Sequence, residues 1–118
     1  MFSDVLQGLV AKLEEARGAA IVGVDGIPLE EHSRGGGPEL ERLAAECTSL
    51  IKAAMETGRA LDQGPAREVV LRCDGAQTLL RSVTSDYFLC LVLGPQAQLG
   101  RARYELQKAC QRLEGELA

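Results

Sequence analysis

The segment Gly18 to Ser33, GAAIVGVDGIPLEEHS, constrains the fold more than any other part of the chain. It holds a short apolar run, an Asp-Gly pair and a second short run. Asp-Gly between strand-like segments indicates a β-hairpin, because both central residues of a type I′ turn need a positive φ. The sequence therefore predicts a hairpin with Asp25 and Gly26 at its tip.

An amphipathic pattern precedes this hairpin. Apolar residues recur at helical spacing from Phe2 to Leu13, with polar residues between them. Ser3 is a candidate N-cap, and Gly18 is the expected stop of this helix. The sequence thus predicts a helix directly before the hairpin.

A second, longer helix is predicted after the hairpin. The Gly-rich stretch 35–38 reads as a flexible loop that places Pro38 near the first helical turn. From about Glu39 to Leu61, a wide apolar stripe alternates with charged positions. The pattern is typical of a helix lying on a sheet.

Three further strands are expected, Ala66–Cys73, Gln77–Thr84 and Tyr87–Leu93, and Asp74-Gly75 forms a second type I′ turn signal between the first two. The last of them, YFLCLVL, is apolar throughout and is typical of a central strand buried on both faces. A closing helix is expected from about Gln96 to Leu117.

The two strands of the hairpin differ in character. Ala19–Val24 is almost continuously apolar, so we expect it to be covered on both faces. Ile27–Glu31 carries Pro28 and two acids, which favour an edge position. The order α-β-β-α-β-β-β-α predicts one α+β domain over residues 1–118, with a single five-stranded antiparallel sheet and helices on both faces.

Composition excludes several partner classes. The 118 residues carry a net charge of −4 and only 3% aromatics, which argues against nucleic-acid binding. No apolar run reaches the roughly 20 residues that cross a bilayer, so membrane insertion is not expected. The first residues carry acids and no basic region, unlike a signal peptide.

Four cysteines lie far apart among apolar neighbours, without a CxxC pair: Cys47, Cys73, Cys90 and Cys110. We interpret them as buried free thiols in a reducing compartment, which predicts a cytoplasmic protein. The single histidine, His32, is expected to be a solvated surface residue.

Residues for catalysis are scarce. One histidine cannot serve a Ser/His/Asp set, and no cysteine lies in a nucleophile motif. The sequence predicts no enzyme activity, cofactor or metal site. An enzyme or small-ligand sensor stays open as an alternative, with Arg81 and His32 as the scattered polar candidates.

The element order, together with GAAIVGVDGIPLEE, LLRSVTSDYFLCLVLG and QAQLGRARYELQKA, resembles the roadblock family of small dimeric domains. The resemblance covers essentially the whole chain. It implies the sheet order 2-1-5-4-3 and a homodimer in which the third strand and the second helix each meet their own copy. The implied dimer residues are Leu50, Ala54, Glu68, Val69, Val70, Leu71 and Arg72.

The family also implies a function. Roadblock proteins regulate or scaffold Ras-like GTPases and motor complexes, and MglB-like bacterial members stimulate GTP hydrolysis without an arginine finger. On this chain, helical geometry assigns the exposed, partner-binding positions of the second helix to Arg42, Glu46, Ser49, Lys52, Ala53 and Glu56. The expected partners are a second copy and a small Ras-like GTPase; the alternative is a dimeric scaffold that leaves GTP turnover unchanged.

Overall fold

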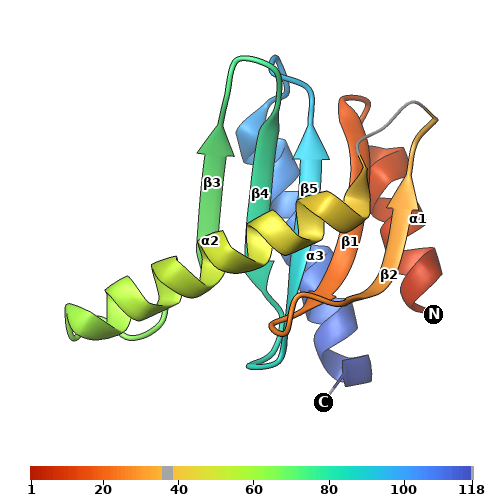
Figure 1. The fold of residues 1–118 in the computed structure, drawn as a ribbon. Helices are drawn as coiled ribbons and strands as arrows, with labels where there is room; N and C mark the ends of the chain where they lie inside the picture. Colours follow the sequence, from red (N-terminus) through yellow and green to blue (C-terminus); the bar gives the residue numbers. More distant parts are fainter. Residues whose placement is uncertain (36–38, 118) are drawn as a thin grey trace.

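A computed structural model describes residues 1–35 and 39–117 (Figure 1). The predicted Pro38 position lies outside these residues. The elements follow one another as predicted: α1 (Phe2–Lys12), β1 (Ala16–Gly23), β2 (Pro28–Ser33), α2 (Leu40–Ala60), β3 (Glu68–Arg72), β4 (Gln77–Ser82), β5 (Tyr87–Leu93) and α3 (Leu99–Leu117). The five strands form one antiparallel sheet in the order β2-β1-β5-β4-β3, which confirms the predicted fold class.

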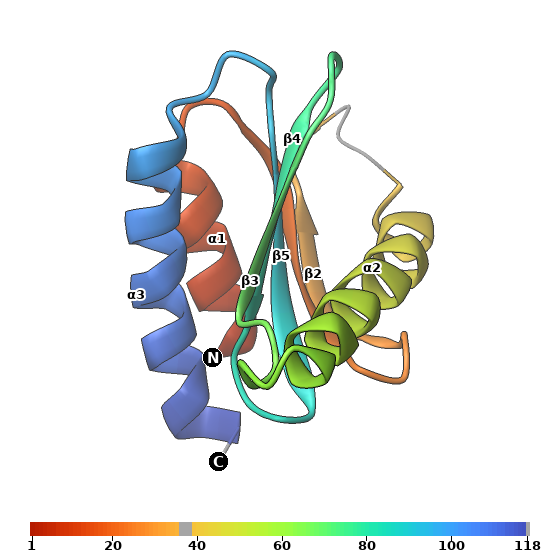
Figure 2. The ribbon, with the colours of Figure 1, turned by 90° about the vertical axis from the view of Figure 1, so that its left-hand side faces the viewer.

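The sheet separates two helical layers. Figure 2 shows α2 on one face and α1 with α3 on the other. Each face has its own apolar cluster: Ile51 of α2 packs with Phe88, whereas Leu6 and Leu106 pack with Ile21. The strands β1 and β5 lie in the middle and are buried on both sides, as their continuous apolar runs predict.

Helix α1 ends earlier than predicted. Gly18 is not its stop, since the helix ends at Lys12 and β1 already begins at Ala16. Ala16 pairs with Leu93, and Gly18 pairs with both Val92 and Ser33. Sheet pairing therefore draws this segment into a strand, and a Cβ at Gly18 would lie 3.2 Å from the backbone oxygen of His32.

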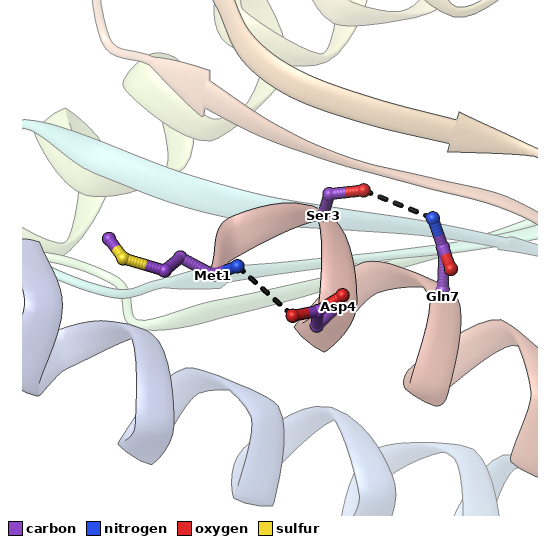
Figure 3. A network of polar contacts seen from close by, with 4 residues as sticks. All are labelled: Met1, Ser3, Asp4 and Gln7. Atoms are coloured by element: carbon purple, nitrogen blue, oxygen red, sulfur yellow. Dashed lines mark hydrogen bonds and ion pairs between the residues drawn. The ribbon is translucent and has the colours of Figure 1, made fainter.

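The start of α1 also differs from the prediction. The helix begins at Phe2, so Ser3 lies inside it and is not the N-cap. Ser3 Oγ instead accepts a hydrogen bond of 3.0 Å from Gln7 Nε2, while the Met1 ammonium lies 3.1 Å from Asp4 Oδ2 (Figure 3). An acid in the first turn also complements the helix dipole.

The tip of the β1–β2 hairpin has a three-residue loop, 24–26, and not the predicted type I′ turn. Gly26 N–H donates to Gly23 O at 2.9 Å, and Gly23 N–H donates to Ile27 O at 2.9 Å. Only Gly26 has a positive φ, at 91°, whereas a type I′ turn needs two such residues. Asp25 Oδ1 accepts from Ile27 N–H at 3.0 Å, which stabilises the loop as an Asx turn.

The second Asp-Gly pair forms a hairpin loop at the predicted place, but the predicted turn type is wrong. Cys73 N–H donates to Ala76 O at 2.9 Å, so Asp74 and Gly75 form a two-residue hairpin loop. Neither residue has a positive φ, which excludes type I′.

Candidate interaction surface

The strand β3 leaves an open edge of hydrogen-bonding groups. Ser82 N–H donates to Arg67 O and Cys73 N–H donates to Ala76 O, both at 2.9 Å. Because antiparallel pairing alternates along a strand, the backbone groups of Glu68, Val70 and Arg72 point away from β4. Since β3 ends the sheet, these groups have no neighbouring strand within the described chain.

The same edge exposes apolar side chains. Val70 is 37% exposed and Leu71 is 41% exposed. Both are apolar residues of a strand, and such residues are usually covered by a neighbouring element. Glu68 and Val69 are half-buried, and Arg72 is exposed. An open edge with exposed Val and Leu is an aggregation hazard unless another chain covers it.

Helix α2 extends past this edge. Figure 1 shows its last turns projecting beyond β3. Its buried residues all lie in the first part of the helix, the last of them being Ile51. Leu50, Ala54 and Met55 are half-buried, and Leu61 directly after the helix is exposed. The predicted dimer residues of α2 and β3 therefore lie on one overhanging margin of the molecule.

A charged cluster fastens β3 to the helix behind it. Arg81 Nη1 donates to Glu68 Oε2 at 3.0 Å, and Arg103 Nε lies 2.7 Å from Glu68 Oε1. Glu68 is thus shared by β4 and α3. These contacts within one chain position the edge strand without a partner.

The predicted partner-binding residues form an exposed strip on α2. All of these residues are exposed: Arg42, Glu46, Ser49, Lys52, Ala53 and Glu56. Five of them recur at spacings of three or four residues, which places them along one side of the helix. Glu56 lies 3.9 Å from Arg59 in the only ion pair recorded for the strip among the described residues.

The two polar candidates for a ligand site do not come together. His32 lies on β2, whereas Arg81 lies on β4 and is engaged by Glu68. Arg81 does line a hollow of about 480 Å³ with Arg59 and Arg67. Among residues 1–35 and 39–117, no group of three or more His, Cys, Asp or Glu side chains is placed to hold a metal ion.

Three cysteines are buried as predicted, but Cys73 is exposed, because it lies beside the β3–β4 loop. The Cys47 and Cys90 thiols meet between α2 and β5. A hydrogen bond to Cys47, together with burial, raises the pKa of Cys90 well above its usual value. Burial also raises the pKa of Cys110, to about 12. Buried thiols with raised pKa values are poor nucleophiles.

One surface was not predicted from the sequence. The hairpin tip exposes Ile27 and Leu29 beside a hollow of about 430 Å³. Ile27 lies before the first residue of β2, and Leu29 lies on the exposed side of that strand with Glu31 and Ser33.

The Roadblock/LC7 domain model matches residues 2–93 of the chain. The chain belongs to the Roadblock/LC7 family. No curated protein matches it. Within the described residues, no helix has both the length and the apolar character that a bilayer crossing requires.

Solved structures share the fold across nearly the whole chain. A Roadblock/LC7 domain from Streptomyces avermitilis is 21% identical, with a TM-score of 0.89 and coverage of 98% of this chain and 96% of that one. The gliding protein MglB from Thermus thermophilus is 21% identical, with a TM-score of 0.87 and coverage of 98% and 88%. An MglB with a tetrameric arrangement is 21% identical, with a TM-score of 0.86 and coverage of 94% and 83%.

Proposed function

We propose that residues 1–118 form a single interaction module that works as a homodimer, binds a small Ras-like GTPase and regulates its GTPase cycle in the cytoplasm. The observation that carries the proposal is the overhanging margin of α2 beside the open edge of β3. Membership of the Roadblock/LC7 family supports the class of partner.

In the proposed dimer, β3 of one protomer pairs antiparallel with β3 of its partner. The outward backbone groups of Glu68, Val70 and Arg72 then find partners, and self-pairing uses the same patch twice. Leu50 and Ala54 of the two α2 helices come together, which covers the overhanging turns. Pairing would also bury apolar surface of Val70 and Leu71. Such burial stabilises an interface by about 25 cal/mol for each Å² of apolar surface removed from water.

The exposed strip of α2 is the proposed binding surface for the GTPase. Paired α2 helices would present two such strips side by side. The proposal includes stimulation of GTP hydrolysis without an arginine finger and without enzyme activity or a cofactor of the module's own. The structural neighbours named MglB favour regulation over pure scaffolding.

The test combines binding with turnover. Each Ras-like GTPase of the source organism is loaded with GTP and mixed with the wild-type chain, Lys52→Glu or Arg112→Glu. Lys52 lies on the α2 strip, and Arg112 is an equally charged, exposed control on α3. Binding and faster hydrolysis, both weakened by Lys52→Glu alone, are expected.

Two results would change the assignment. Binding without any change in GTP turnover would favour the dimeric scaffold. Absence of binding to every Ras-like GTPase would overturn the proposed function.

A further inference from the structure

The β1–β2 hairpin presents an apolar projection to solvent. Ile27 is 66% exposed and Leu29 43% exposed, and Pro28 joins them. Leu29 is the extra residue of a β-bulge, since Ile21 pairs with Glu30 and Val22 pairs with Pro28. Bulges redirect side chains, and adjacent exposed apolar residues beside a hollow are typical of a contact site.

The hairpin tip is held rigidly. Two backbone hydrogen bonds close its loop, and Asp25 Oδ1 accepts from Ile27 N–H. Val24 N–H also donates to Asp86 O at 2.9 Å, which fastens the tip to the β4–β5 turn. A preorganised surface loses little conformational entropy when a partner binds.

The hollow beside the tip combines apolar walls with negative charge. Its volume is about 430 Å³, and Ile27, Leu29 and Tyr87 line it together with Asp25 and Asp86. No Lys or Arg of the described chain lines it. Such a site fits a Lys or Arg side chain, whose aliphatic stem packs on apolar walls while its charge meets carboxylates.

Charge also argues against a second copy as the occupant. Glu30 and Glu31 follow the tip, and in the described parts of the chain no ion pair involves them, Asp25 or Asp86. Two acidic hairpins would repel each other, whereas a basic partner would be attracted.

The hairpin lies next to the proposed binding surface for the GTPase. Both ribbon views place the β1–β2 loop beside α2 (Figures 1 and 2). A Cβ built on Gly26 would lie 3.9 Å from Thr48 Oγ1, and Thr48 directly precedes Ser49 of the exposed strip. Thr48 itself is buried, so this contact places the tip beside the sheet-facing side of the helix whose outer side carries the strip. A partner that covers the strip would need to reach around this edge of α2 to contact the tip.

We infer that the hairpin tip, with Ile27, Leu29 and the acidic hollow, is an anchor for the GTPase partner, which presents an apolar side chain flanked by Lys or Arg. This inference rests on the proposed function. The tip supplies apolar contact, and the carboxylates select the charge of the partner.

The test measures binding of Ras-like GTPases of the source organism to the protein by titration calorimetry. Each GTPase is loaded with a non-hydrolysable GTP analogue, and the affinity is measured at two salt concentrations. Ile27→Ser removes the apolar projection, Asp86→Asn removes one charge from the hollow, and Lys52→Glu alters the α2 strip. Tyr104→Ser is the matched control, since Tyr104 is 60% exposed on α3. Thermal unfolding checks that each variant is folded.

We expect Ile27→Ser to weaken binding about tenfold or more, as central apolar residues of interfaces do. Asp86→Asn should weaken binding several-fold at low salt and less at high salt, and Tyr104→Ser should leave it within twofold. If the wild-type chain binds and only Lys52→Glu weakens binding, the hairpin anchor is wrong and the proposed function stands. If the wild-type chain binds no GTPase, both are overturned.

Discussion

Glu68 Oε1 lies 2.7 Å from Arg103 Nε, and this ion pair connects the edge strand β3 to helix α3. The same carboxylate accepts from Arg81 at 3.0 Å, and the Glu68 side chain is only 16% exposed. Charge-assisted hydrogen bonds at a partly buried carboxylate contribute more than an exposed ion pair. The cluster thus fixes the position of the edge that we propose to pair.

Replacing Glu68 tests this contribution. Glu68→Ala leaves Arg81 without its acceptor, so the free energy of unfolding should fall by about 1–3 kcal/mol. Glu116→Ala, at an exposed acid of α3, should change it by less than about 0.5 kcal/mol. Urea unfolding at a fixed protein concentration measures both. Equal effects of the two variants would show that the cluster does not stabilise the edge.

Two helical glycines should respond oppositely to alanine. A Cβ at Gly58 of α2 would clash with the backbone oxygen of Gly64, in the connection to β3, whereas a Cβ at Gly8 of α1 meets nothing within 4 Å. We expect Gly8→Ala to stabilise the protein by about 0.5–1 kcal/mol and Gly58→Ala to destabilise it. Thermal unfolding compares the two variants. A stabilising Gly58→Ala would contradict the close approach of the two backbones.

Proline at the β3 edge should disrupt the proposed dimer without disrupting β4. The Val70 N–H points away from β4, so Val70→Pro removes a donor that only a second protomer would use. Ser33→Pro is the control at the opposite edge, because Arg34 N–H donates to Arg17 O and the Ser33 N–H therefore points outward.

Light scattering measures the mass of each variant in solution. Val70→Pro should be monomeric, and Ser33→Pro should keep the mass of the wild-type protein. A dimeric, folded Val70→Pro would rule out pairing through β3.

The buried thiol of Cys110 predicts a loss of stability in alkali. Burial raises its pKa from 9.0 to about 12, so the folded protein keeps a proton that the unfolded chain releases. The contribution to stability is full below about pH 9 and declines as the pH rises toward 12.

The free energy of unfolding should therefore fall less steeply in Cys110→Ser than in the wild-type protein, by up to about 1.4 kcal/mol per pH unit. Denaturant unfolding between pH 9 and pH 11 measures this slope. Cys73→Ser, which removes an exposed thiol, is the matched control. Identical slopes in the wild-type protein and Cys110→Ser would contradict the burial of this thiol.

Local sequence patterns correctly predicted the elements that have a continuous apolar run or a clear apolar stripe. Tyr87–Leu93 matches its apolar run from end to end, and α2 lies within one residue of its predicted bounds. Gly18 misled the prediction because the pairing of Ala16 with Leu93 joins residues far apart in sequence. The loop of the first hairpin was wrong because the pairing of Gly23 with Ile27 sets a three-residue loop.

The candidate site was predictable in part for similar reasons. Helical spacing correctly indicated the exposed positions of α2, from Arg42 to Glu56. The exposure of Cys73 was missed because its apolar neighbours belong to the end of an edge strand whose last three residues are themselves exposed. The hairpin tip was missed because Ile27 was predicted to be a strand residue, whereas β2 begins at Pro28 and leaves Ile27 outside the strand.

The mass of the chain in solution with its GTPase tests the central proposal most directly. Multi-angle light scattering is applied to the chain alone and mixed with a GTP-analogue-loaded Ras-like GTPase of the source organism. The proposal predicts twice the 12.6 kDa of one chain, and a heavier species containing two copies after mixing. A 12.6 kDa species unchanged by any such GTPase would contradict it.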